Sequence, residues 1–217
     1  MPAMTLVLVL CLGAEPTAPA LTVDAFLDAW AEKTRDVHSL TLSFRQEKRL
    51  RLLRRPKLSE GEVFYAGEKL FVRVREPGGS VETELLLRDG TLKILYLKLK
   101  RLEVIEVGKS GRTGGGGPGP LPVFTADPRT LKKDFEVAVE RRGAEDVLRL
   151  RPQKEGSEVK EIEIVLADFQ LRRYRQVSTT GDELRLEVTS VTPNPDLPAD
   201  TFELKVPPGT KTVRPAP

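Results

Sequence analysis

The stretch SLTLSFRQEKR, residues 39–49, has the pattern of a β-strand with one buried face. Leu40, Leu42 and Phe44 occupy every second position, and polar residues fill the positions between them. Successive side chains of a strand point to opposite faces, so this spacing predicts a strand that packs on a core with one face only.

Basic residues crowd the segment that follows. Residues 45–57 contain seven Lys or Arg and a single acid, Glu47. A free basic arm would bind a polyanion such as nucleic acid, whereas two strands with cationic outer faces would carry the same residues in solvent. Pro56 interrupts the alternation, which resumes at residues 62–65. Because the chain has no helix-turn-helix or zinc-finger motif, we interpret the segment as two strands and a cationic connection, and expect no nucleic-acid binding.

The composition of the chain favours one domain with a core of its own. At 217 residues it can bury roughly 70% of its unfolded surface without disulfides or metals. It has 35 Lys and Arg against 32 Asp and Glu, which gives a formal net charge of +3. The basic segment is therefore offset by acidic residues elsewhere, and the sequence as a whole is not that of a polyanion-binding protein.

Residues suited to catalysis or metal binding are scarce. His38 is the only histidine and Cys11 the only cysteine, so no Cys/His cluster can hold zinc. The chain also lacks a P-loop, a dinucleotide-binding glycine pattern and the G-x-S-x-G motif of hydrolases. We therefore predict a binding protein and not an enzyme, with no cofactor and no metal site.

The N-terminus has the features of an export signal. Thr5–Ala14 is an apolar run too short to span a bilayer, and Ala18–Ala20 matches an A-x-A cleavage site. The residues before the run contain no Lys or Arg, which leaves open whether the natural start codon lies upstream. We predict a signal peptide over residues 1–20, cleavage after Ala20, a periplasmic protein and a single mature domain over residues 21–217.

Past the signal, the chain shows one amphipathic helix and then many short strands. Residues 22–39 place apolar side chains at helical spacing, with Trp30 as a core anchor. The Gly-rich segment Gly108–Pro122 predicts a loop, with its role as a passive linker or a gate left open, and Asp127-Pro128 predicts the start of a short helix. Further strands are expected at residues 70–75, 84–88, 92–99, 104–107, 135–141, 146–151, 158–166, 171–178, 183–191 and 202–206, with Lys98, Lys100 and Arg101 pointing outward.

This pattern predicts a mainly β fold, either a barrel, a sandwich or a curved sheet covered by helices. Several short motifs make the sequence similar to the LolA-like family, the periplasmic carriers of outer-membrane lipoproteins. The similarity spans nearly the whole mature chain. The motifs are Phe44-Arg45-Gln46, Ser59-Glu60-Gly61, Leu70-Phe71 with Pro77, Asp89-Gly90 with Tyr96, and Asn194 with Phe202 and Pro207-Pro208-Gly209.

The resemblance implies an unclosed antiparallel β-barrel, a half-barrel, covered by α-helices that enclose a hydrophobic cavity. It implies a soluble, monomeric carrier that binds lipoprotein acyl chains or another lipid, receives them from an inner-membrane release complex and delivers them to an outer-membrane receptor. Contact with membranes would be transient. On this basis the cavity residues are expected to be Trp30, Leu42, Phe44, Phe71, Leu87, Ile94 and Tyr96.

The sequence departs from the family pattern around Phe71. If the family register holds, Phe71, Arg73 and Arg75 face the cavity, and two unpaired buried cations would each cost several kcal/mol, about 2–7 by transfer measurements. Either the strand is turned, with Leu70, Val72 and Val74 inward, or the arginines lie at a wet cavity mouth. In the second case they would contact a lipid head group, a partner, or the carboxylate of Glu82 or Glu84.

Two other functions remain open from sequence. One is a lipid-sensing regulatory or interaction module, similar to the envelope-stress regulators that share the half-barrel. The other is an exported protein whose basic strand face binds anionic glycolipid or phospholipid surfaces, with binding that salt would weaken steeply.

Overall fold

The computed structural model describes residues 22–106 and 127–214. The predicted signal peptide, residues 1–20, and the Gly-rich segment 108–122 lie outside the described residues. In the described part, no helix is long and apolar enough to cross a membrane.

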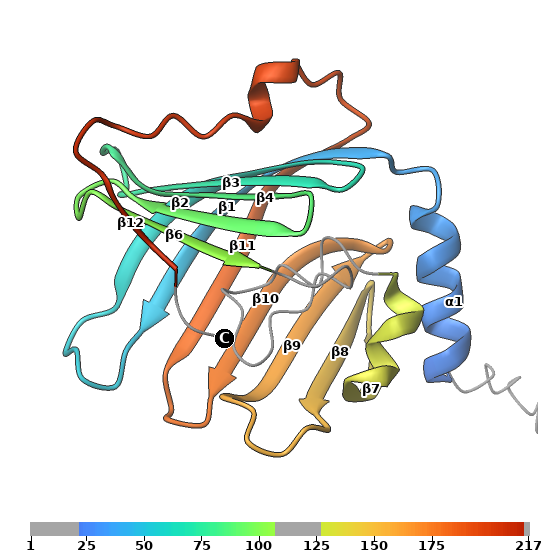
Figure 1. The fold of residues 1–217 in the computed structure, drawn as a ribbon. Helices are drawn as coiled ribbons and strands as arrows, with labels where there is room; N and C mark the ends of the chain where they lie inside the picture. The colour runs from blue at the N-terminus through green and yellow to red at the C-terminus, as the bar shows by residue number, and fades with distance from the viewer. Residues whose placement is uncertain (1–21, 107–126, 215–217) are drawn as a thin grey trace, which may run out of the picture.

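One α-helix, two 3-10 helices and twelve strands make up the described fold (Figure 1). The helices are α1 (Val23–Thr34), η1 (Pro128–Lys133) and η2 (Ala199–Phe202). The strands of the first half are β1 (Ser39–Arg49), β2 (Lys57–Ala66), β3 (Lys69–Arg75), β4 (Val81–Arg88), β5 (Thr91–Tyr96) and β6 (Arg101–Glu106). Those of the second half are β7 (Phe135–Arg142), β8 (Glu145–Pro152), β9 (Val159–Ala167), β10 (Gln170–Ser178), β11 (Glu183–Pro193) and β12 (Lys211–Val213).

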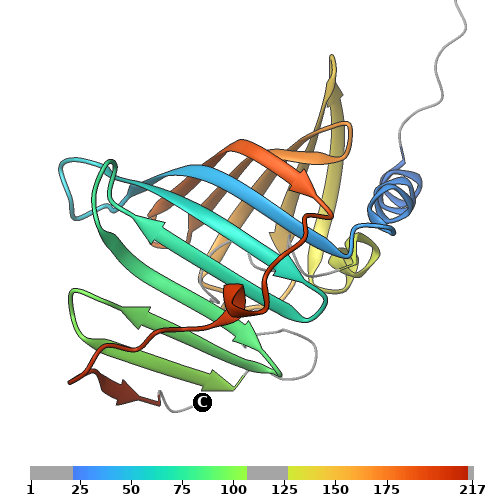
Figure 2. The same cartoon turned by 90° about the horizontal axis from the view of Figure 1, so that it is seen from above.

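All twelve strands form one sheet in the order β12-β6-β5-β4-β3-β2-β1-β11-β10-β9-β8-β7. Every pairing is antiparallel except that of β12 with β6. The sheet bends so strongly that β7–β10 lie across from β2–β5 (Figures 1 and 2), yet its two edge strands, β12 and β7, are not paired with each other. The predicted mainly β half-barrel is confirmed, although α1 and η1 cover it only at the β7 end.

Local capping explains where the helices begin. The Thr22 hydroxyl accepts a hydrogen bond from the Ala25 amide at 3.3 Å, which is the N-cap expected from sequence. Asp127 caps η1 by accepting from the Arg129 amide at 3.0 Å, with Pro128 in the first turn. The first helix is shorter than predicted and ends at Thr34.

Asn194 joins the two halves of the sheet where β1 begins and β11 ends. Its side-chain oxygen accepts from the His38 amide and its side-chain NH₂ donates to the Asp36 carbonyl, both at 3.0 Å. Its own amide donates to the Ser39 carbonyl at 2.8 Å. Its φ of 52° is left-handed, which asparagine tolerates better than most residues. These bonds hold residues 35–38 in a non-helical conformation and give this asparagine a structural role.

Two predicted strand segments are wrong. Residues 97–100 form a turn, with Lys100 at a φ of 45°, so the alternation restarts in a new phase at Arg101. Residues 202–206 are not a strand either: Phe202 ends the 3-10 helix η2, and its ring packs against Phe71 and Leu86. The closing strand is β12, and the segment between β11 and β12 runs over the sheet on the face opposite α1 (Figure 1).

Phe44 and Gly61 lie directly opposite each other on β1 and β2. A Cβ atom added at Gly61 would collide with the Phe44 ring and would lie 2.8 Å from the Arg73 carbonyl oxygen. Two residues along the same pair of strands, the Gln46 side chain donates to the Ser59 hydroxyl at 2.9 Å. The motifs F-x-Q and S-x-G are therefore two cross-strand contacts that fix the pairing of β1 with β2.

We predict that Gly61→Ala destabilises the protein by about 1–3 kcal/mol, the usual effect of overpacking a filled site. Chemical denaturation of the mature chain measures it. In the background of Phe44→Leu, whose side chain is smaller, the same substitution should cost less. Equal costs in the two backgrounds would show that the Phe44 ring is not what requires glycine.

Candidate functional site

The registers place one continuous row of apolar residues on the inner face, the face of the sheet on which α1 packs. Leu42, Val63, Val72, Leu85 and Ile94 are successive cross-strand neighbours from β1 to β5. Neighbours in such a row contact each other directly. The inner face is therefore apolar across half of the sheet.

The inner face near α1 is filled by the protein's own side chains. Phe26, Leu27 and Trp30 of α1 are buried in one cluster with Leu42 and Phe44. The same cluster includes buried residues of the facing strands β8–β11, namely Leu148, Leu150, Ile162, Ile164, Leu166, Leu171, Tyr174 and Leu186. Trp30, Leu42 and Phe44 are thus brought together as predicted, but as part of a packed core.

A second cluster continues the inner face over β4 and β5. Leu85, Leu92 and Ile94 are its buried members, and Leu87 and Tyr96 pack against them. Val72 and Leu87 also pack against the first cluster, so the two are continuous. Among the described residues, the apolar contacts of this cluster all come from the same face of the sheet, and no helix packs on it.

Tyr96, Arg101 and Glu103 form a polar group beside this cluster. The Arg101 guanidinium lies 4.8 Å from the centre of the Tyr96 ring and 2.9 Å from a Glu103 carboxylate oxygen. The Tyr96 hydroxyl donates to Glu103 at 3.4 Å, and burial, followed by the Glu103 charge, raises the pKa of Tyr96. The Nε atom of Arg101 is buried and has no hydrogen-bond acceptor among the described residues.

Sequence analysis missed this position because it counted Arg101 as outward-pointing. The turn at residues 97–100 changes the phase, and Arg101 is the cross-strand neighbour of Tyr96 on the inner face. The only local signal was the pair of lysines in the turn, which does not predict a left-handed φ at Lys100.

Phe71, Arg73 and Arg75 lie on the outer face, opposite α1. Leu70, Val72 and Val74 point inward, so the strand is turned, as the first of the two alternatives left open by the sequence has it. Arg73 donates to Glu84 at 2.9 Å, and Arg75 pairs with Glu62. The expected place of Phe71 in an inner cavity, and of the two arginines at its mouth, is therefore not found: each cation has a carboxylate partner on a neighbouring strand of the outer face.

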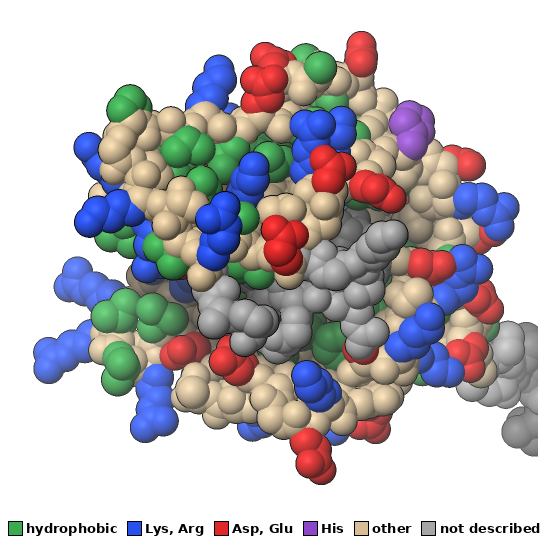
Figure 3. All heavy atoms as spheres, in the orientation of Figure 1, with side chains coloured by type: hydrophobic (Ala, Val, Ile, Leu, Met, Phe, Trp, Pro, Cys, Tyr) green, Lys and Arg blue, Asp and Glu red, His purple; other side chains and the backbone are tan. Residues whose placement is uncertain are grey.

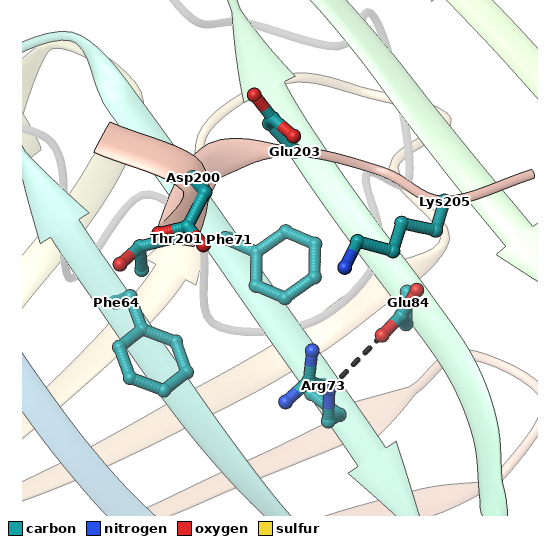
Figure 4. Close-up of a pocket in the computed structure, with 8 residues that line it drawn as sticks. All are labelled: Phe64, Phe71, Arg73, Glu84, Asp200, Thr201, Glu203 and Lys205. Atoms are coloured by element: carbon teal, nitrogen blue, oxygen red, sulfur yellow. Dashed lines mark hydrogen bonds and ion pairs between the residues drawn. The ribbon is translucent and has the colours of Figure 1, made fainter. Parts of the chain in front are cut away.

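The outer face has a pocket of about 290 Å³ beneath the C-terminal segment (Figure 4). Phe64 and Phe71 form its floor, and charged side chains surround them in the figure. Five of its eight lining residues are charged, which does not suit a hydrocarbon chain. The eight are Phe64, Phe71, Arg73, Glu84, Asp200, Thr201, Glu203 and Lys205. Within the described residues, no group of three or more His, Cys, Asp or Glu could hold a metal ion.

Comparison with known families agrees with this architecture. Residues 116–205 match the family described as outer membrane lipoprotein carrier protein LolA. The chain is a divergent LolA-like protein. No curated protein matches the sequence.

Solved structures show the same fold at low sequence identity. An uncharacterized conserved protein from Thermus thermophilus is 12% identical with a TM-score of 0.51, covering 89% of this chain and 100% of that chain. A LolA superfamily protein from Nitrosomonas europaea is 14% identical with a TM-score of 0.45, covering 85% and 99%. The Pseudomonas aeruginosa MucA/MucB complex matches at 16% identity with a TM-score of 0.44, covering 84% and 61%. At these identities the likeness concerns the fold alone.

We predict that Phe202→Ala releases the C-terminal segment from this LolA-like sheet. The ring is buried against Phe71 and Leu86, and truncation of a buried phenylalanine costs about 3–5 kcal/mol. Limited proteolysis should then cut near η2 much faster. Val206→Ala, at an exposed position of the same segment, is the control. Unchanged cleavage of the Phe202 variant would contradict the role given to this ring.

Proposed function

We propose that this chain is a periplasmic carrier that holds the acyl chains of a lipoprotein, or another lipid, on the inner face of the half-barrel. The observation that carries the proposal is the apolar cluster of Leu85, Leu92 and Ile94, on which no described helix packs. The cluster is continuous with the core, so a bound chain would extend an existing apolar surface.

Reversible binding of a hydrocarbon chain needs only burial. Each CH₂ group that leaves water stabilises a complex by about 0.8 kcal/mol. Release then requires a competing apolar surface, such as a membrane or a receptor, and no covalent step. The chain would accordingly act as a carrier and not as an enzyme.

Arg101 is the residue we assign to the polar end of the ligand. Its buried Nε lacks an acceptor among the described residues and is held beside the second cluster through Glu103 and the Tyr96 ring. An ester carbonyl or phosphate oxygen at that point would complete its hydrogen bonds. The sequence analysis assigned this role to Arg73 and Arg75, but those residues lie on the other face.

The family likeness supports the remaining parts of the proposal. Transfer from an inner-membrane release complex to an outer-membrane receptor, and action as a monomer, follow from the resemblance to lipoprotein carriers. Export to the periplasm agrees with the predicted signal peptide. The wider possibility that the chain is a lipid sensor predicts the same binding face without transfer.

We predict that Ile94→Trp and Ile105→Trp each weaken binding of a fluorescent acyl probe at least tenfold. Both residues belong to the inner face, where an indole would fill the volume that the ligand needs. Lys93→Trp places the same ring on the outer face of β5 and should leave binding unchanged. Probe titration measures affinity, and thermal melting confirms that each variant is folded.

Native mass spectrometry of the protein purified from its periplasm is the complementary test. A lipid or lipidated protein that co-purifies with the chain supports the proposal. If neither travels with it and the purified chain takes up no acyl probe, the proposed function is wrong. Equal weakening by Lys93→Trp and Ile94→Trp would show that the inner face is not where the probe binds.

A further inference from the structure

The hairpin that joins β1 to β2 ends in a segment with the sequence LRLLRRP, residues 50–56, here called the hairpin tip. All of its residues are exposed. Leu52 keeps 94% of its surface in solvent and Leu53 keeps 54%. A leucine so fully exposed at a fixed position is unusual, since apolar surface in water is unfavourable. The exposure needs an explanation beyond folding.

The hairpin tip has a defined shape. The Leu53 amide donates to the Leu50 carbonyl at 2.8 Å, which closes a turn. The Arg51 amide donates to a carboxylate oxygen of Asp182, also at 2.8 Å, and this bond ties the tip to the connection between β10 and β11. The two leucines are therefore presented outward by the backbone.

The charges of the hairpin tip are unpaired. In the described part of the chain, Arg51, Arg54 and Arg55 make no ion pair, and the tip contains no acidic residue. The basic residues just outside it differ: Arg49 pairs with Glu47, and Lys57 pairs with Glu82. The three free guanidinium groups are thus confined to the segment that carries the exposed leucines.

A second turn at the same end of the sheet repeats this combination. The registers place residues 97–100, between β5 and β6, on the side where β1 ends and β2 begins. There Leu99 is 66% exposed and lies between Lys98 and Lys100. Figure 3 shows hydrophobic side chains surrounded by Lys and Arg at this end of the molecule.

We propose that the hairpin tip docks the protein on an anionic phospholipid membrane. Leu52 and Leu53 would enter the boundary between head groups and acyl chains, while Arg51, Arg54 and Arg55 contact lipid phosphates. The turn at Leu99 would provide a second, weaker contact. This assignment locates the membrane contact on a loop and not on a strand face, and it does not depend on the cargo.

Nucleic acid fits the hairpin tip poorly. Single strands are bound through aromatic side chains that stack on bases, and the tip has none. Fully exposed leucines have no apolar partner along a phosphate backbone, whereas a lipid interface offers both phosphates and hydrocarbon. Charge and hydrophobicity together therefore favour the membrane.

Vesicle flotation with the full mature chain tests the proposal. Binding should be strong to vesicles of phosphatidylglycerol mixed with phosphatidylcholine and absent from pure phosphatidylcholine. The triple variant Arg51→Gln/Arg54→Gln/Arg55→Gln should bind about a hundredfold more weakly, because each basic residue contributes roughly a factor of five at an anionic surface.

A matched variant controls for net charge. Lys33→Gln/Lys160→Gln/Arg172→Gln removes the same charge from exposed positions on α1, β9 and β10 and should bind like the wild type. An equal loss of binding in both triple variants would overturn the proposal, since it would show that only net charge matters.

Insertion of the leucines has a separate readout. Leu52→Ser/Leu53→Ser should weaken binding at least tenfold while all charges remain. In Leu52→Trp, brominated lipids should quench the new indole, whereas Val206→Trp on the C-terminal segment should not be quenched; the native Trp30 is buried. If the serine variant binds normally, or Leu52→Trp is not quenched, the tip is only an electrostatic patch and the proposal is wrong.

Discussion

The contact between the Phe44 ring and Gly61 fixes the register on which both faces of the sheet depend. β1 lies between β2 and β11, near the middle of the strand order, so its pairing sets the alignment of both halves. A slip of one residue between paired strands would exchange their inner and outer side chains. Arg73 and Arg75 would then face the core without their carboxylate partners, which is the arrangement that transfer free energies make most costly.

Sequence signals that act locally predicted the structure well. The Thr22 cap, the Asp127-Pro128 start and the Asp89-Gly90 hairpin each depend on residues within a few positions of one another. Asp89 and Gly90 both have positive φ, as a two-residue hairpin of this type requires. The boundaries of these elements could therefore be read from the chain with small errors.

Long-range features were not predictable in the same way. The sequence LFVRVR of β3 is compatible with either orientation, because Phe71 is as apolar as its neighbours. What decides the orientation is the position of Glu62 and Glu84 on neighbouring strands, which pair with Arg75 and Arg73. Phe202 was misassigned for the same reason, since its partners Phe71 and Leu86 are far away in sequence.

The ion pairs of the outer face and the free arginines of the hairpin tip have different consequences. Exposed pairs such as Arg75 with Glu62 contribute only about 0–1 kcal/mol each to stability. They do cancel the charge of the strands, so the face near β2–β4 presents little net field. The positive potential of this region is concentrated at the tip, where no carboxylate of the described residues opposes it.

The packing of α1 limits what a bound lipid can displace. Its three buried side chains, Phe26, Leu27 and Trp30, each stabilise the folded state by about 1.5–3 kcal/mol, or about 5–9 kcal/mol together. At about 0.8 kcal/mol per CH₂, an acyl chain would have to bury about six to eleven methylene groups to replace them. A long acyl chain could therefore displace α1 and a short one could not. The cluster over β4 and β5 carries no such cost from α1, so a chain would begin to bind there and move the helix only if it is long enough to reach it.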